Sequence, residues 1–125
     1  MNTISRDDFL SSISRIAGSV YDFHKRFGVP ALNGGSPDQT LATLRSRLAF
    51  LAEEMGEHAK ELNRGNVPDA AVELADVAFV ALGSLLVLDN AGCDASLTVA
   101  RKNDAKTEQT HVFEKSSGKL VRRVP

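Results

Sequence analysis

The chain has 125 residues, of which 42% are hydrophobic, and fifteen Lys and Arg residues stand against sixteen Asp and Glu residues. This length suits one domain with its own core, and the formal net charge of −1 excludes a broad basic surface for a nucleic-acid polymer. The single cysteine, Cys93, excludes an intramolecular disulfide framework and a zinc site built on Cys/His clusters.

The first predicted helix is defined by apolar residues three or four positions apart: Phe9, Ile13, Ile16, Val20, Phe23 and Phe27. Ser5 is a suitable N-cap, and Gly28 and Pro30 predict the end of the helix. Residues 1–10 contain acids where a signal peptide has basic residues and an apolar run, so we expect a cytosolic protein.

The second predicted helix begins after Ser36, a good N-cap, with Pro37 at the first helical position and Gln39 placed to close a capping box. It extends to about Arg64, before Gly65. Its apolar face consists of Leu41, Leu44, Leu48, Leu51, Met55, Ala59 and Leu62.

The third predicted helix begins near Pro68 and extends to a break at residues 91–94. Apolar residues occur on every side of it, so we expect it to be the central, buried element. Its longest uncharged apolar run, residues 77–88, has twelve residues, whereas a membrane span needs about 20. We therefore expect no interaction with a membrane.

A fourth, shorter helix is predicted from about residue 94 to residue 107. The tail contains two short β-type runs around residues 116–118, which favour a small hairpin or an extended arm. The sequence thus predicts one all-α domain of about four helices, with its core in residues 5–107 and a C-terminal arm in residues 108–125.

Acidic residues on the second and third predicted helices form the main candidate site. Glu53, Glu54 and Glu57 share an arc of about 100°, which on this helix alone is typical of a solvated surface. Glu73 and Asp76, however, are the only charges within residues 72–88. Burial of ionised carboxylates costs several kcal/mol each unless they are paired or bind a cation.

A hard metal ion is the simplest counterion for this acidic pair. No Lys or Arg occurs between residues 65 and 100, and the favourable helix dipole does not reach Asp76. Ligands that are all carboxylate oxygens favour Mg²⁺, with Mn²⁺ as a substitute. A di-iron site is disfavoured because the usual Glu-x-x-His pattern is missing.

The order of these acids, EEMGE at residues 53–57 and ELAD at residues 73–76, resembles the MazG-like nucleoside triphosphate pyrophosphohydrolases. The segments VYDFHKRFGVP and ARKNDAK look like the flanking segments of the phosphoribosyl-ATP-pyrophosphohydrolase-like branch, so the resemblance covers about residues 20–107. It implies an all-α MazG-like bundle that hydrolyses a (deoxy)nucleoside triphosphate to the monophosphate and pyrophosphate with Mg²⁺.

Matched position by position, Glu54, Glu57, Glu73 and Asp76 resemble the metal ligands of this family. Glu53 resembles the carboxylate that positions or deprotonates the attacking water, and it can contact a further ion. These roles agree with the chemistry, because metal ions are needed to hold triphosphate oxygens in an acidic pocket.

Six candidate substrate contacts complete the predicted site: Asn103, Lys106, Lys102, Arg47, His24 and Phe23. Asn103 and Lys106 resemble the phosphate-contacting Asn and Lys of the family. Arg47 is placed to contact a phosphate or to pair with an acid, and His24 to contact a base or sugar or to lie on the surface. Phe23 continues the apolar seam and is expected in the core, with base stacking as the alternative.

Two other interpretations remain open. One is a non-catalytic helical interaction module whose acids are only solvated charge, and the other is phosphoribosyl-ATP as the substrate. No motif selects the base or distinguishes ribose from deoxyribose. The resemblance also implies a homodimer or homotetramer, in the cytosol of a bacterium or of a phage-infected host.

Overall fold

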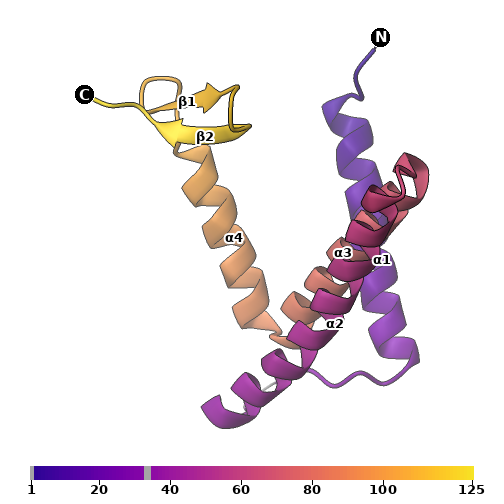
Figure 1. The fold of residues 1–125 in the computed structure, drawn as a ribbon. Coiled ribbons are helices and arrows are strands. Elements are labelled where there is room, and N and C mark those ends of the chain that lie inside the picture. The colour runs from indigo at the N-terminus through magenta and orange to yellow at the C-terminus, as the bar shows by residue number, and fades with distance from the viewer. Residues whose placement is uncertain (1, 33–34) are drawn as a thin grey trace. The chain divides into compact units, whose positions relative to one another are not determined.

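The computed structural model describes residues 2–32 and 35–125, which form four helices and one two-stranded antiparallel sheet (Figure 1). The elements are α1 (Arg6–Arg26), α2 (Pro37–Asn63), α3 (Val67–Val87), α4 (Asn90–Asp104), β1 (His111–Glu114) and β2 (Lys119–Arg122). The predicted all-α fold with a C-terminal hairpin is therefore confirmed. Residues 33–34, in the predicted loop between the first two helices, lie outside the described residues.

The chain divides into two compact units, which we describe separately. The first extends to Cys93 and contains α1, α2, α3 and the first turn of α4, whereas the second comprises Asp94–Pro125. The second unit thus begins inside α4, earlier than residue 108, where the sequence predicts the arm to begin.

The helix starts are fixed by the side chains that the sequence predicts. Ser5 Oγ accepts a hydrogen bond from the backbone N–H of Asp8 at 3.1 Å. Ser36 and Gln39 form a complete capping box, in which each side chain accepts from the backbone N–H of the other. After α1 the chain reverses at Gly28, whose φ of 63° lies in the left-handed region that glycine tolerates.

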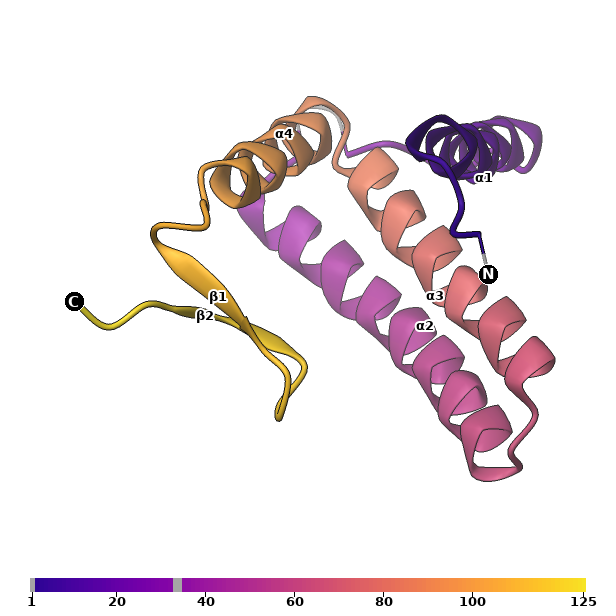
Figure 2. The same ribbon diagram turned by 90° about the horizontal axis from the view of Figure 1, so that it is seen from above.

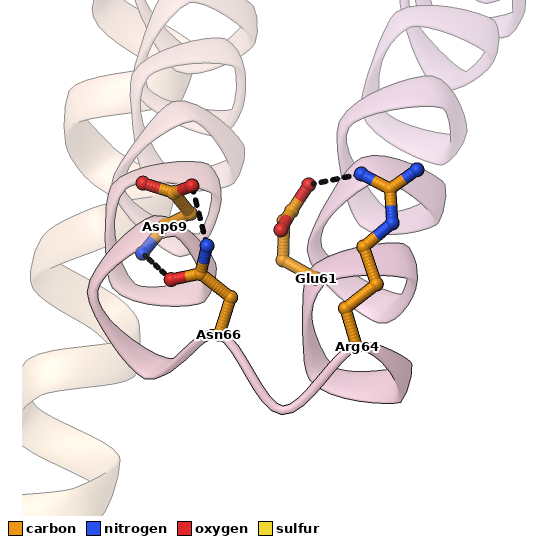
Figure 3. Close-up of polar contacts among 4 residues, drawn as sticks. All are labelled: Glu61, Arg64, Asn66 and Asp69. Atoms are coloured by element: carbon orange, nitrogen blue, oxygen red, sulfur yellow. Dashed lines mark hydrogen bonds and ion pairs between the residues drawn. The ribbon is translucent and has the colours of Figure 1, made fainter.

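The turn between α2 and α3 is short, and two acidic residues, Glu61 and Asp69, form polar contacts within it (Figure 3). Glu61 accepts from Arg64 Nη1 at 3.2 Å, and Asn66 bonds both the carboxylate and the backbone N–H of Asp69. Gly65, with φ 71°, makes the reversal itself. The turn therefore brings α2 and α3 together as an antiparallel pair (Figure 2).

Helix α3 lies between α1 and α2 and contacts both of them (Figure 2). Val20 from α1 and Ala70 and Val87 from α3 are buried at these contacts. Other apolar residues of α3, such as Val72 and Leu74, stay exposed. The expectation of a fully buried third helix is thus wrong for the single chain, because two neighbours cannot cover a helix that is apolar all round.

By length and composition alone, α3 also meets the test for a membrane span. This is weak evidence, since the core helix of a soluble protein passes the same test. In the structure 17% of this apolar window is buried, and α3 packs against two helices and carries acids in its first half.

The side of α2 that faces α3 is not the one that its apolar pattern predicts. The half-buried positions include Arg47, Leu51, Glu54 and His58, which follow one another at intervals of three or four residues. The predicted apolar face overlaps this strip only in part: Leu44 and Leu51 are half-buried, whereas Leu48 is 62% exposed and Met55 is 56% exposed. Glu54, at one edge of the acidic arc, therefore lies on the side of α2 that faces α3.

In the second unit, β1 and β2 pair antiparallel with His111 opposite Arg122 and Glu114 opposite Lys119. Gly118, with φ 71°, permits the turn between the strands. Of the two alternatives for the tail, the hairpin is the one observed.

Candidate active site

Three carboxylates from α2 and α3 converge on one point in the first unit. Glu54 comes from α2, and Glu73 and Asp76 lie three residues apart on α3. One oxygen from each carboxylate can be chosen such that all three lie within 4.8 Å of one another. The antiparallel pairing of α2 and α3 thus brings together acids that are about twenty positions apart in the chain.

Partial burial, together with repulsion between the carboxylates, raises the pKa of two acids of the cluster. Partial burial raises the pKa of Glu54, and the negative charges of Asp76, Glu53 and Glu57 raise it further. Burial likewise raises the pKa of Glu73, with added effects of Asp76, Glu54 and Glu57. Glu53 and Glu57 therefore add to the negative field, although they lie outside the cluster of three.

No cationic side chain compensates this cluster within the described part of the chain. Arg64, at the end of α2, is bound to Glu61. Salt-bridge partners of Glu54, Glu73 and Asp76 are missing among the residues that the structure describes. His58 Nδ1 lies 2.7 Å from the carbonyl oxygen of Ala70, so this imidazole is engaged away from the cluster.

The donor set fits a hard divalent cation. All three donors are carboxylate oxygens, and two oxygens on opposite sides of a Mg²⁺ ion lie about 4.2 Å apart. The bound of 4.8 Å on the separations within the cluster is close to this value. Thiolate and imidazole ligands, which softer metals prefer, are missing from this cluster.

A cavity of about 400 Å³ adjoins the cluster within the first unit. Its lining combines aromatic, apolar and charged groups from three helices and the segment after α1: Phe23, His24, Val29, Arg47, Phe50, Glu53, Glu54, Asp76, Phe79 and Val80. Phe23 meets Phe79 edge to face, with ring centroids 5.5 Å apart. Since Phe23 remains 41% exposed, it forms a cavity wall rather than part of a closed core.

His24 and Arg47 stand together on the wall of this cavity. His24 is only 7% exposed, and burial together with the charge of Arg47 lowers the pKa of its imidazole. Arg47 Nε donates to Ser84 Oγ at 2.7 Å, and Nη2 donates to the carbonyl oxygen of Val80 at 3.4 Å. Of the two alternatives for His24, a surface position is therefore excluded, and Arg47 forms no ion pair with an acid among the described residues.

The remaining predicted residues lie in the second unit. Lys106 Nζ donates to Asn103 Oδ1 at 3.0 Å, and Asn103 Nδ2 donates to the carbonyl oxygen of Val99. Lys102 lies on the same helix and is exposed. The contact between Lys106 and Asn103 agrees with their predicted spacing, and phosphate binding by these residues stays a prediction.

Sequence reasoning missed the cavity residues Phe50 and Phe79 and the Gly83–Ser84 pair. The aromatic residues lie among apolar positions whose direction a helical pattern does not reveal. A signal did exist at Gly83, because a glycine inside a helix costs about 1 kcal/mol relative to alanine and often has a packing reason.

The chain matches a known protein family. The sequence model of the family described as phosphoribosyl-ATP pyrophosphohydrolase matches residues 20–90. These residues include α2, α3, all five acids and the whole lining of the cavity. Neither a curated protein nor a solved structure matches the chain significantly.

The lowered pKa of His24 predicts a specific pH dependence of stability. Because the folded state binds this proton less readily than the unfolded chain, His24 contributes stability above its ordinary pKa of 6.5. That contribution is lost as the pH falls through 6.5 toward the folded value. The acidic cluster has the opposite sign, since protonation relieves its repulsion.

Chemical denaturation of the wild type and of His24→Gln between pH 8 and pH 5.5 isolates this effect. We expect the difference in unfolding free energy, wild type minus variant, to decrease as the pH falls. A difference that is constant over this range would contradict the assignment of His24 as a buried, neutral imidazole.

Proposed function

Because the chain belongs to the phosphoribosyl-ATP pyrophosphohydrolase family and is thus a MazG-like pyrophosphohydrolase, we propose that it hydrolyses (deoxy)nucleoside triphosphates with Mg²⁺. The products would be the nucleoside monophosphate and pyrophosphate. The observation that carries this proposal is the convergence of Glu54, Glu73 and Asp76 at the edge of a cavity with aromatic walls.

The acids would hold the cation, and the cavity would hold the nucleotide. Glu54, Glu73 and Asp76 are the proposed ligands, with Glu57 as a further carboxylate close enough to raise the pKa of two of them. A Mg²⁺ ion bound there would draw in phosphate oxygens and stabilise the charge that develops on them. Without a cation, the negative field of the cluster would repel a triphosphate.

Glu53 is the proposed general base. It lines the same cavity as Glu54 and Asp76 but lies outside the cluster of three carboxylates. Its carboxylate would accept a proton from water as the water oxygen bonds to the α-phosphorus. The bond from that phosphorus to the oxygen bridging to the β-phosphorus then breaks, and pyrophosphate leaves with the bond electrons.

The aromatic walls provide a place for the base. Phe23, Phe50 and Phe79 present ring surfaces to the cavity, and His24 offers a ring nitrogen beside them. Stacking on aromatic rings tolerates every base, so this arrangement supports a nucleotide without selecting one. Asn103, Lys106 and Lys102 of the second unit remain proposed phosphate contacts.

Phosphoribosyl-ATP is the second candidate substrate, and the description of the matching family favours it. The bond broken would be the same, between the α- and β-phosphorus atoms. Both substrates would therefore use the same acids, and only a direct comparison of turnover separates them.

We also propose that the protein is a homo-oligomer, at least a dimer. The apolar face of α2, made of the leucines and Met55 named above, is largely exposed, as are Phe9 and Ile13 on α1. Large exposed apolar surfaces are rare on monomers and mark association sites. A second copy of the chain would bring an equal apolar face to cover them.

Mg²⁺ or Mn²⁺ is expected to stabilise the wild-type protein against unfolding. At a metal concentration one hundred times Kd, binding to the folded state alone contributes about 2.7 kcal/mol. Glu54→Gln and Asp76→Asn should lose most of this response, and without metal they should be at least as stable as the wild type because repulsion is reduced.

Glu61→Gln is the matched control, since it removes a carboxylate from the same helix that is bound to Arg64 instead. Thermal unfolding with Mg²⁺, with Mn²⁺ and with chelator measures all four proteins. An equal metal response in Asp76→Asn and Glu61→Gln would place the ion elsewhere.

Glu53→Gln is expected to lower turnover by about 10²- to 10⁴-fold, the usual contribution of a general base. It should keep the stabilisation by metal. The assay measures pyrophosphate and monophosphate release from ribo- and deoxyribonucleoside triphosphates and from phosphoribosyl-ATP.

The same substrates, tested with and without chelator, decide the function itself. Metal-dependent release of pyrophosphate supports the proposal and ranks the substrates. A folded wild type that turns over none of them would favour the non-catalytic interaction module. Full turnover by Glu53→Gln would remove the base assignment alone.

Leu48→Glu is expected to shift the protein from a dimer or larger assembly to a monomer, because a charge would be buried in the contact. Ser46→Glu adds the same carboxylate to an exposed position of α2 outside the apolar face and should leave the assembly intact. Sedimentation velocity separates these outcomes, and a monomeric wild type would overturn the proposed assembly.

A further inference from the structure

The second half of α3 contains a glycine that makes room for two side chains from other helices. Gly83 is buried, and a Cβ atom at this position would lie 2.6 Å from Arg47 Nη2 and 2.9 Å from His24 Nε2. Real Cβ atoms essentially never lie this close to other heavy atoms. The guanidinium of Arg47 and the imidazole of His24 can therefore occupy their positions only because residue 83 has no side chain.

The next residue, Ser84, fixes the orientation of Arg47. Ser84 Oγ donates to the carbonyl oxygen of Val80 at 3.2 Å and accepts from Arg47 Nε at 2.7 Å. Val80 also accepts from Arg47 Nη2. Since the hydroxyl proton is directed to Val80, a lone pair of the oxygen faces Arg47. One edge of the guanidinium is thus held against α3.

The other edge of the guanidinium is available to a ligand. Arg47 Nη1 has no hydrogen-bond partner among the described residues, and Arg47 lines the cavity together with Glu53, Glu54 and Asp76. No carboxylate in the described part of the chain lies within 4.0 Å of this cation. A half-buried guanidinium without an anion is incompletely compensated, and its planar N–H groups suit phosphate oxygens.

We infer that Gly83 and Ser84 are positioning residues, which seat Arg47 so that its Nη1 side binds an oxygen of the phosphate chain in the cavity. This inference rests on the proposed function for the identity of the ligand. The metal cluster and Arg47 would then bind the phosphate chain from two places on the same cavity wall. Among the residues that the structure describes, Arg47 is the only Lys or Arg that lines this cavity.

Binding of inorganic tripolyphosphate to the full chain in the presence of Mg²⁺ tests the inference without requiring turnover or a particular base. Gly83→Ala inserts a methyl group where Arg47 and His24 lie, and Ser84→Ala removes the oxygen that accepts from Arg47. We expect both variants to weaken tripolyphosphate binding about ten- to hundredfold, the usual effect of losing a charge-assisted hydrogen bond. Stabilisation by Mg²⁺ should be unchanged.

Gly18→Ala is the matched control, since it makes the same change in α1 where no atom lies within 4 Å of the added methyl group. Arg47→Lys is expected to behave like Ser84→Ala, because an ammonium group cannot bond Ser84 and a phosphate with one rigid fork. Should Gly83→Ala fail to fold, Ser84→Ala and Arg47→Lys still decide the question.

Calorimetric titration gives outcomes that separate this inference from the proposed function. Wild-type affinity in Gly83→Ala and Ser84→Ala would overturn the inference while triphosphate turnover still stood. A wild type that does not bind tripolyphosphate would overturn it as well. Weakened binding in the variants, with an intact response to Mg²⁺, would support it even if no nucleotide tested is hydrolysed. Where the wild type does hydrolyse a nucleotide, KM should rise more than kcat falls.

Discussion

Repulsion between carboxylates of α2 and α3 is the constraint on which the first unit depends. The two helices pack together along a strip that includes Glu54, and Glu73 and Asp76 meet it from the other side. Arg64 bonds Glu61 at the turn, and Arg47 bonds Ser84 on α3 through one edge of its guanidinium. Packing of the two helices therefore holds these like charges close together, and the proposed divalent cation would relieve their repulsion.

The sequence was sufficient to predict four helices, the N-caps of the first two and the acids that converge. It was wrong about the break at residues 91–94, because α3 ends at Val87 and α4 begins at Asn90. Ser36 and Gln39 can both satisfy backbone groups in only a few conformations. The capping box could therefore be predicted from the sequence alone. The expected cost of burying two charges within an apolar helix pointed to Glu73 and Asp76 before any geometry was available. In the structure, however, Glu73 is only half-buried and Asp76 is exposed. Their roles as ligands remain predictions.

Other features of the site depend on which helix covers which face, and periodicity does not contain this information. The pattern of α2 separates an apolar face from an acidic arc, whereas α3 packs on the strip between them. The aromatic wall formed by Phe50 and Phe79 depends on that rotation. The seat of Arg47 depends on the missing side chain of Gly83, whose effect is visible only when three helices are placed together.

The short turn between α2 and α3 also bears on how the chain folds. Every acid of the site lies within one helical hairpin, residues 53–76, closed by a turn of three residues. Such local contacts form early, because little loop entropy is lost in closing them. The like charges would then meet in the folding transition state, before the rest of the unit can compensate for their repulsion. If the proposed cation binds there, it would accelerate folding as well as slow unfolding, because it would relieve this repulsion in the transition state.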